Sequence, residues 1–172
     1  MKLLPCVAVT ALLLFRQAHA DDACSAFKWD MKHEHTLFMH EGHTATVGKD
    51  DKSAPMLDMD RLYLITLAPQ KTVKFAAPPS KKAPAASGSA GLVHFRIAKA
   101  GQYRVSADVP LWIDLVADGK AIAPVDFSSA HECTAPRKVV LYDLPASQAL
   151  TVQLSGSSEA QAHITLTPVP KS

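Results

Sequence analysis

Apolar and polar residues alternate in the second half of the chain. Val93, Phe95 and Ile97 would lie on one side of an extended chain, and His94 and Arg96 on the other. A period of two, with one apolar and one polar face, is typical of antiparallel strands that cover a core on one side. This segment is therefore predicted to be such a strand.

The same alternation returns after a turn at residues 99–101, in the segment 103–109, with Arg104 on its polar side. The two segments are predicted to pair as a hairpin. Apolar and β-branched runs between turn residues predict further strands at 61–67, 72–75, 111–117, 120–122, 137–144, 149–155 and 160–167. We expect the side chains that face the interior to include Phe95, Val105, Leu141, Val152 and Ile164.

Turn residues recur every eight to twelve positions or so, and no helical period separates the strands. This spacing predicts an all-β fold, an antiparallel β-sandwich or jelly roll. A short N-terminal helix is expected before it, with Asp30 as its cap. Residues 41–60 and the Pro/Ala-rich segment 76–90 are predicted to be loops, the second of them a mobile surface loop. Residues 21–172 would form a single domain.

The first twenty residues have the composition of a secretory signal peptide. A short charged start is followed by an apolar run from Leu3 to Phe15 and by the small residues Ala18 and Ala20. Cleavage after Ala20 is expected, and the protein is predicted to be periplasmic or secreted. The apolar run is too short to be a stable membrane anchor.

Loss of Lys2 and Arg16 with this peptide would leave 16 basic and 16 acidic side chains, and therefore no net charge with His neutral. A neutral chain argues against nucleic acid as a partner. Cys6 would also be lost, so that Cys24 and Cys133 remain. Two cysteines in an oxidising compartment are expected to pair, and closing so long a loop stabilises a fold by roughly 4–5 kcal/mol in the chain-entropy model.

Four histidines lie within eleven residues near the start: His33, His35, His40 and His43. Met31 and Met39 lie among them, and imidazole with thioether ligands suits copper or zinc. These histidines are the candidate metal ligands. The alternative is a polar, solvated helix and loop that is rich in histidine and holds no ion.

Catalytic motifs are absent from the sequence: it contains no GxSxG, GxGxxG or HExxH. His131 lies close enough to Cys133 to suggest a nucleophile pair, but a disulfide sulfur is not a nucleophile. Trp112 could stack on a ligand. It is predicted to be a core residue, because its neighbours are apolar and no row of aromatic residues accompanies it.

The segments VHFRIAKAGQYRVSAD, LWIDLVADGK and VVLYDLPASQALTVQLSG give a strand, a turn into a second strand, a strand ending in Asp-Gly and a late strand pair. In this pattern residues 91–169 resemble the small β-sandwich modules related to bacterial prepeptidase C-terminal domains, which implies a non-catalytic module. The whole mature chain, with CSAFKWDM and VPLWIDL, resembles small exported proteobacterial proteins of unknown role, some of them labelled homogentisate 1,2-dioxygenase. The His/Glu/His iron ligands of true homogentisate dioxygenases cannot be matched to this chain.

Three functions follow, in decreasing order of preference. The first is an exported, non-catalytic β-sandwich that acts as an accessory or binding protein of the cell envelope, for an unknown ligand or envelope protein and with no cofactor. The second is a periplasmic copper- or zinc-binding protein that uses the His/Met segment 31–43. The third is an enzyme similar to homogentisate dioxygenase.

Overall fold

The computed structural model describes residues 24–81, 88–146 and 148–170. The predicted signal peptide, residues 1–20, lies outside these ranges. The described elements are the helix α2 (Lys32–Phe38), the 3₁₀ helix η1 (Gln70–Thr72), and the strands β1 (His43–Thr46), β2 (Tyr63–Thr66), β3 (Ala68–Pro69), β4 (Ser89–Ile97), β5 (Gly101–Ala107), β6 (Trp112–Ala117), β7 (Lys120–Ile122), β8 (Asp126–Ser129), β9 (Lys138–Leu144), β10 (Gln148–Ser157) and β11 (Gln161–Pro168). No helix within the described residues is long and apolar enough to cross a membrane.

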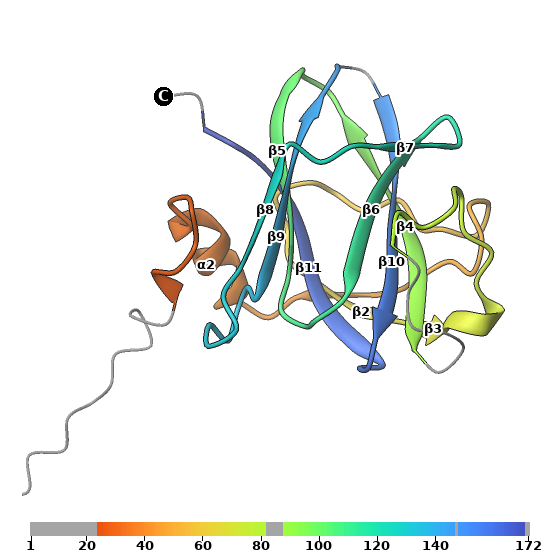
Figure 1. Cartoon of the computed structure of the whole chain (residues 1–172), viewed down its shortest axis with the longest axis horizontal. Helices are drawn as coiled ribbons and strands as arrows, with labels where there is room; N and C mark the ends of the chain where they lie inside the picture. Colours follow the sequence, from red (N-terminus) through yellow and green to blue (C-terminus); the bar gives the residue numbers. More distant parts are fainter. Residues whose placement is uncertain (1–23, 82–87, 147, 171–172) are drawn as a thin grey trace, which may run out of the picture.

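The strands form two sheets that face each other as in a sandwich (Figure 1). One sheet has six strands in the order β1-β2-β11-β5-β9-β8, and the other has five in the order β3-β4-β10-β6-β7. All pairs are antiparallel except β1 with β2. The prediction of a mostly antiparallel, two-sheet β fold with one short helix is therefore confirmed.

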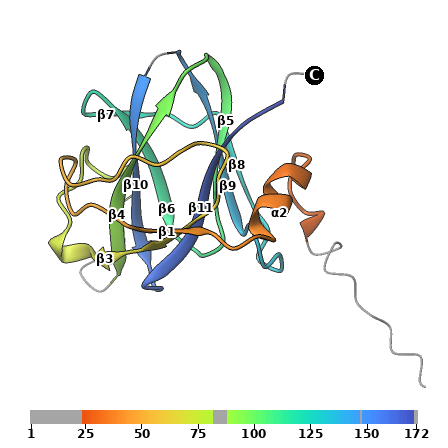
Figure 2. The ribbon, with the colours of Figure 1, turned by 180° about the vertical axis from the view of Figure 1, so that it is seen from behind.

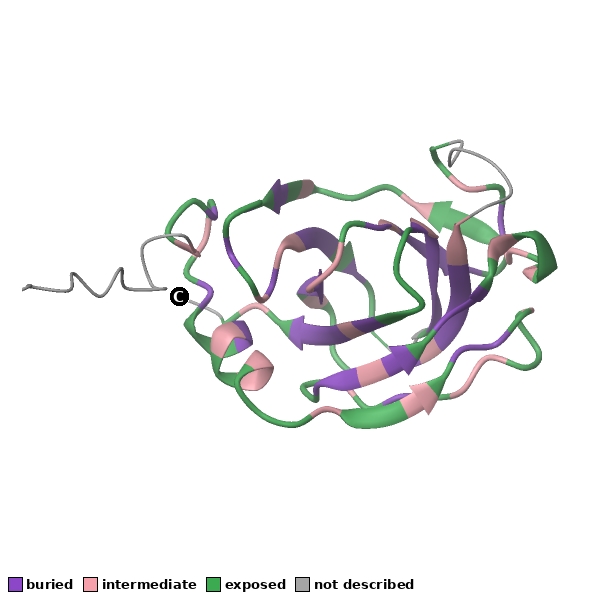
Figure 3. Ribbon diagram, turned by 90° about the horizontal axis from the view of Figure 1, so that it is seen from below, coloured by how far each residue is buried: buried purple, intermediate pink, exposed green. Residues whose placement is uncertain are grey.

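Buried residues lie along the strands of both sheets (Figure 3), and their apolar side chains form one core. Phe95, Val105, Val152 and Ile164 are fully buried there, as predicted. The prediction for Leu141 is wrong: it is buried, but it pairs with Arg104 and so lies on the outer face of the six-stranded sheet. The register places its neighbours in the interior instead, which shifts the expected alternation of β9 by one residue.

The outer face of the six-stranded sheet is covered by the N-terminal segment, with α2 beside β9 and β11 (Figures 1 and 2). Arg104 was expected in water on this face, but only 6% of it is exposed. Its guanidinium donates to the Glu34 carboxylate at 3.2 Å and to the Asp30 carbonyl at 2.9 Å. Glu34, 1% exposed, also accepts from the Thr167 hydroxyl. The buried charge of Arg104 is thus paired rather than solvated.

Local predictions near the N-terminus hold in part. The predicted helix forms, and the Asp30 carboxylate accepts from the backbone N–H of Lys32, although Asp30 precedes the cap position, which is Met31. Residues 41–60 are not a loop throughout, because β1 pairs in parallel with β2.

The strand predicted at 72–75 does not form, since η1 occupies its start. The sequence analysis also missed β8, an edge strand paired only with β9.

The Pro/Ala-rich segment is not a free loop at its two ends. The backbone of Ala77, a buried residue, donates to the side chain of Gln153 on the outer face of the five-stranded sheet. Ser80 is bonded to Asp114 of β6, and the strand β4 already begins at Ser89. Residues 82–87 lie outside the described ranges. Residues 76–81 therefore cover one sheet, as α2 covers the other.

Replacing Arg104 by Met is expected to lower the free energy of unfolding by about 3–5 kcal/mol, because it leaves the Glu34 carboxylate buried without its cation. Adding Glu34→Gln to this variant should recover a large part of the loss, since no buried charge then remains. Urea denaturation of the two variants measures both values. Arg96→Met, at an exposed position of β4, is the control and should change the stability by less than about 0.5 kcal/mol. An Arg104→Met variant as stable as the control would mean that the pair does not hold the N-terminal segment.

Candidate functional site

The four candidate metal ligands of the N-terminal segment have different surroundings. His33 lies beside the Asp60 carboxylate, and the His43 ring contacts Arg61, at 3.2 Å, and the ring of Tyr63. His40 is exposed in the turn after α2. The structure does not bring these side chains together at one point. Neighbours in sequence diverge here because the helix turns them to different sides and the chain then extends into β1.

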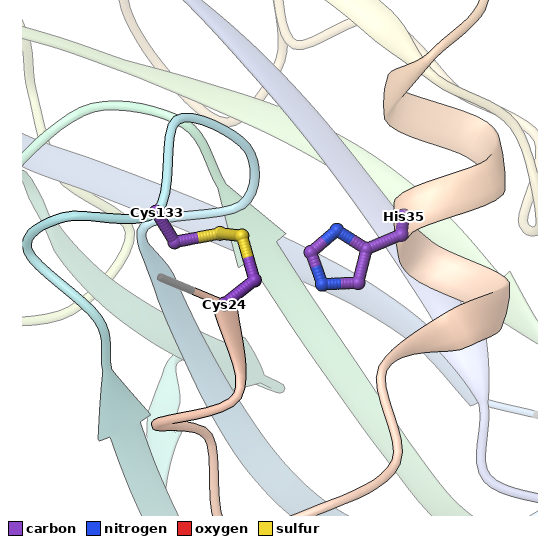
Figure 4. Close-up of side chains that lie close together, drawn as sticks. All are labelled: Cys24, His35 and Cys133. Carbon is purple, nitrogen blue, oxygen red and sulfur yellow. A yellow bond between two sulfur atoms is a disulfide. The ribbon is translucent and has the colours of Figure 1, made fainter. Parts of the chain in front are cut away.

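His35 instead lies beside Cys24 and Cys133. The predicted disulfide between Cys24 and Cys133 is present, and it joins the N-terminal segment to the loop between β8 and β9. The His35 ring of α2 is turned toward this disulfide (Figure 4). One ring nitrogen and the two sulfur atoms all lie within 4.8 Å of one another, the single set of three such ligand atoms in the part of the chain described.

The oxidised sulfurs limit what this cluster can do. A disulfide sulfur carries no thiolate charge, and thiolate is the form that binds metal. In the oxidised protein the cluster is therefore a structural link with a half-buried imidazole beside it. A shallow pocket of about 300 Å³ opens next to it, lined by Cys24, Ser25, Trp29, Asp30, Met31, Lys32 and His35.

A second site lies where β6 and β9 begin, at one end of the sandwich. The ammonium groups of Lys138 and Lys81 lie 4.4 Å and 5.1 Å from the centre of the Trp112 ring. Trp112 was predicted to be a core residue, but it is only half-buried and lies on the outer face of its sheet. Both ammonium groups make cation–π contacts with the indole, so that positive charge and apolar surface lie next to each other at this site.

These three side chains line a cleft of about 310 Å³. The remaining lining residues are Pro110, Leu111, Ser129, His131, Arg137, Ser155 and Gly156. No carboxylate is among them. A smaller cavity of about 90 Å³ adjoins it, since both are lined by Trp112, Ser129 and Lys138, and the exposed Phe127 lines this second space. The volume of the larger cleft, about 310 Å³, lies at the lower end of the range for small-molecule binding sites.

The cleft places Lys138 in an unfavourable environment for a charge. Burial lowers the pKa of Lys138 below the usual 10.5, and the neighbouring ammonium of Lys81 lowers it further, while Asp114 acts in the opposite direction. Its ammonium donates to the Leu111 carbonyl at 2.9 Å, which leaves two of its three donor hydrogens for other partners. An anion in the cleft would relieve this unfavourable electrostatic environment.

Asp114 fixes the positions of Trp112 and of the segment that carries Lys81. Its buried carboxylate accepts from the Ser80 hydroxyl, and one of its oxygens lies 3.0 Å from Nε1 of Trp112. Nε1 of Trp112 also donates to the Ser80 hydroxyl oxygen at 2.7 Å. This network orients the indole and holds the segment that carries Lys81 against the sheet. Both donors are neutral, so that Asp114 keeps its charge and partly offsets that of Lys138, although it lines the adjoining cavity and not the cleft itself.

A further polar cluster joins Thr151, Asp51 and His94. The Thr151 hydroxyl donates to the Asp51 carboxylate at 2.8 Å and lies 3.2 Å from Nδ1 of His94, whose Nε2 donates to the Asp51 carbonyl at 2.7 Å. The single hydroxyl proton is therefore directed at the carboxylate and not at the histidine, which does not hold it as a general base would. His94, predicted on the polar side of its strand, is half-buried in this cluster, and His163 is half-buried elsewhere, with its Nδ1 2.7 Å from the Asp108 carboxylate.

Of the residues that form the cleft, the sequence analysis singled out only Trp112 as a candidate ligand contact. The paired cations Arg137 and Lys138 at the start of a strand were one available signal. Lys81, at the end of a Pro-rich run, was another. Their convergence depends on which strands pair, and a pattern along the chain does not report it.

Comparison of the sequence with models of known protein families finds no match, and comparison with curated proteins finds none either.

Replacing Asp114 by Asn is expected to loosen the segment 76–81, because a carboxylate that binds Ser80 and Trp112 becomes a neutral amide. Trypsin should then cut after Lys81 about tenfold faster than in the wild type, since local opening becomes easier by a kcal/mol or more. Mass spectrometry of the timed digest identifies the site. Ser158→Ala, in an exposed turn, should leave the rate unchanged. An unchanged rate in Asp114→Asn would show that this network does not hold the segment.

Proposed function

We propose that the protein is an exported, non-catalytic β-sandwich that binds a small organic anion in the Trp112 cleft, as a binding or accessory protein of the cell envelope, periplasmic or secreted. The observation that supports this most is the position of the Lys81 and Lys138 ammonium groups over the Trp112 ring, in a cleft that Arg137 also lines and whose lining contains no carboxylate. The ligand class follows from the charge and the ring.

The charge of the cleft is local. The mature chain carries as many acidic as basic side chains, yet three permanently or usually cationic groups line one small space. Like charges repel, and the lowered pKa of Lys138 reflects this cost together with that of burial. Asp114 offsets part of this cost, and an anion bound in the cleft would offset more of it. A carboxylate, phosphate or sulfonate group is therefore the expected polar part of the ligand.

The Trp112 ring and the apolar side chains around it define the other part. Pro110 and Leu111 line the same cleft, and the adjoining cavity reaches Phe127 and Val140. An inorganic anion would leave this apolar surface uncovered. A planar or aliphatic group attached to the anion would bury it.

Two lines support a binding rather than a catalytic role. The sequence has no motif of a nucleophile or a phosphate-binding loop, and the hydroxyl proton of Thr151 is directed at Asp51 rather than at His94. The resemblance to prepeptidase C-terminal modules points the same way. The predicted signal peptide and the disulfide support an oxidising compartment.

Copper or zinc binding by His33, His35, His40 and His43 together receives no support from their separate surroundings. The dioxygenase proposal rests on a label alone.

Lys138→Met is expected to weaken the binding of benzenesulfonate about tenfold or more at neutral pH, because a charge-assisted contact to the sulfonate is lost. Fluorescence titration of the indole measures the affinity. Benzyl alcohol, which lacks the charge, should bind weakly and equally to both proteins. Lys120→Met, on the exposed strand β7, is the matched control and should bind benzenesulfonate as the wild type does. Equal affinity in Lys138→Met would overturn the assignment of the cleft.

The pH dependence has a definite sign. Since the pKa of Lys138 is lowered, its ammonium is lost at a lower pH than that of an exposed lysine. The affinity for benzenesulfonate, whose charge is constant, should therefore fall as the pH rises toward 10.5, and fall earlier than in a protein with ordinary lysines. In Lys138→Met this part of the profile should be absent. A wild-type profile that is flat in this range would contradict the role of Lys138.

A further inference from the structure

We propose that reduction of the Cys24–Cys133 disulfide creates a binding site for a d¹⁰ metal ion, Cu(I) or Zn(II), with His35 as the third ligand. The site is distinct from the cleft and does not depend on its function. The observation behind it is that three residues from separate segments of the chain place two sulfurs and one imidazole nitrogen within 4.8 Å of one another (Figure 4).

The required rearrangement is small. Sulfurs bound to one tetrahedral zinc lie about 3.8 Å apart, given Zn–S bonds of about 2.3 Å. The two cysteine Cα atoms are already 4.7 Å apart, and side-chain rotation can open the sulfurs to that separation. The imidazole does not have to approach from a distance, since it faces the sulfurs in the oxidised protein.

His35 is held in place by the fold rather than by the disulfide alone. The preceding residue, Glu34, is bound to Arg104 of β5 and to Thr167 of β11. Because these contacts do not involve the cysteines, α2 has an anchor that survives reduction. The Cys133 loop is anchored separately, through hydrogen bonds of Arg137 to the His131 carbonyl and of Ala130 to the Arg137 carbonyl.

An ion can reach this position. The pocket of about 300 Å³ beside the disulfide is lined by Cys24, His35 and the ion pair of Lys32 with Asp30. Cys133 itself is buried, so that the ion would enter from the side of Cys24. Two thiolates and an imidazole complete the coordination of three-coordinate Cu(I), and with one water molecule from the pocket they complete that of tetrahedral Zn(II).

The chemistry balances with a dithiol as the reductant. The dithiol transfers two electrons and two protons to the Cys24–Cys133 bond, becomes a disulfide itself, and leaves two thiols. Metal binding then displaces both thiol protons, and the neutral His35 ring donates a lone pair. The oxidised protein has neither thiolate and should not bind the ion at this site.

The test uses the exported protein in its oxidised form and after reduction with a dithiol that is then removed without oxygen. Cu(I) is titrated in competition with a chromophoric chelator, and Co(II) replaces Zn(II) to report thiolate ligation by charge-transfer absorption. We expect one ion per reduced chain and affinity at least about 100-fold weaker in the oxidised chain. His35→Ala should weaken binding by about tenfold or more after reduction, whereas His40→Ala, on the exposed turn, should not. The two titrations decide which ion is preferred.

Thermal melting followed by circular dichroism keeps the test decisive if reduction destabilises the fold. A bound ion should raise the melting temperature of the reduced wild type, and less so that of reduced His35→Ala. Equal binding by the oxidised and reduced proteins would overturn the proposal, as would equal melting shifts in the wild type and His35→Ala. Binding by reduced His35→Ala with unchanged affinity and charge-transfer absorption would show a two-thiolate site without the histidine, and this also contradicts it.

Discussion

The buried carboxylate of Glu34 holds the N-terminal segment to the body of the fold. It accepts from Arg104 and Thr167 on the outer face of the six-stranded sheet, a face that also buries Ser106 and Thr165. Without α2 above it, this polar face would be solvated, and the position of His35 beside the disulfide would not be defined. An ion pair of this kind contributes less through its own net energy than through the single docking geometry that satisfies both charges.

Asp114 has the same structural role on the outer face of the five-stranded sheet. Its carboxylate binds Ser80 and the Trp112 indole, so that the Pro-rich segment crosses the five-stranded sheet and brings Lys81 to the cleft. Each sheet thus has one buried carboxylate on its outer side, and each carboxylate fixes a segment without strand structure. The residue next to each fixed position, His35 or Lys81, belongs to a candidate site. The sandwich supplies the rigid floor, and the covering segments supply the chemistry.

The strands that flank the core were predictable because a period of two is a local property of the sequence: the alternation around Phe95 and Val105 predicts both strands correctly. The disulfide was predictable because Cys24 and Cys133 are the only two cysteines of the chain outside the predicted signal peptide. The burial of the polar outer face was not predictable, since alternation tells which side chains point outward but not which of them another segment covers. Arg104 is therefore buried against expectation, by residues some seventy positions away. The cleft depends in the same way on which strands pair and on where residue 81 is held.

The most direct test of the central claim, that the Trp112 cleft binds an organic anion, is a two-dimensional NMR titration of the ¹⁵N-labelled protein with benzenesulfonate. The chain has two tryptophans, so that the indole N–H signals form a small, assignable set. The account predicts that the Trp112 signal, whose N–H lies between Ser80 and Asp114, shifts saturably while that of Trp29 does not. Backbone shifts at Lys138 and Arg137 should follow the same curve. A titration in which Trp112 stays unperturbed, or in which both indoles drift together without saturation, would contradict it.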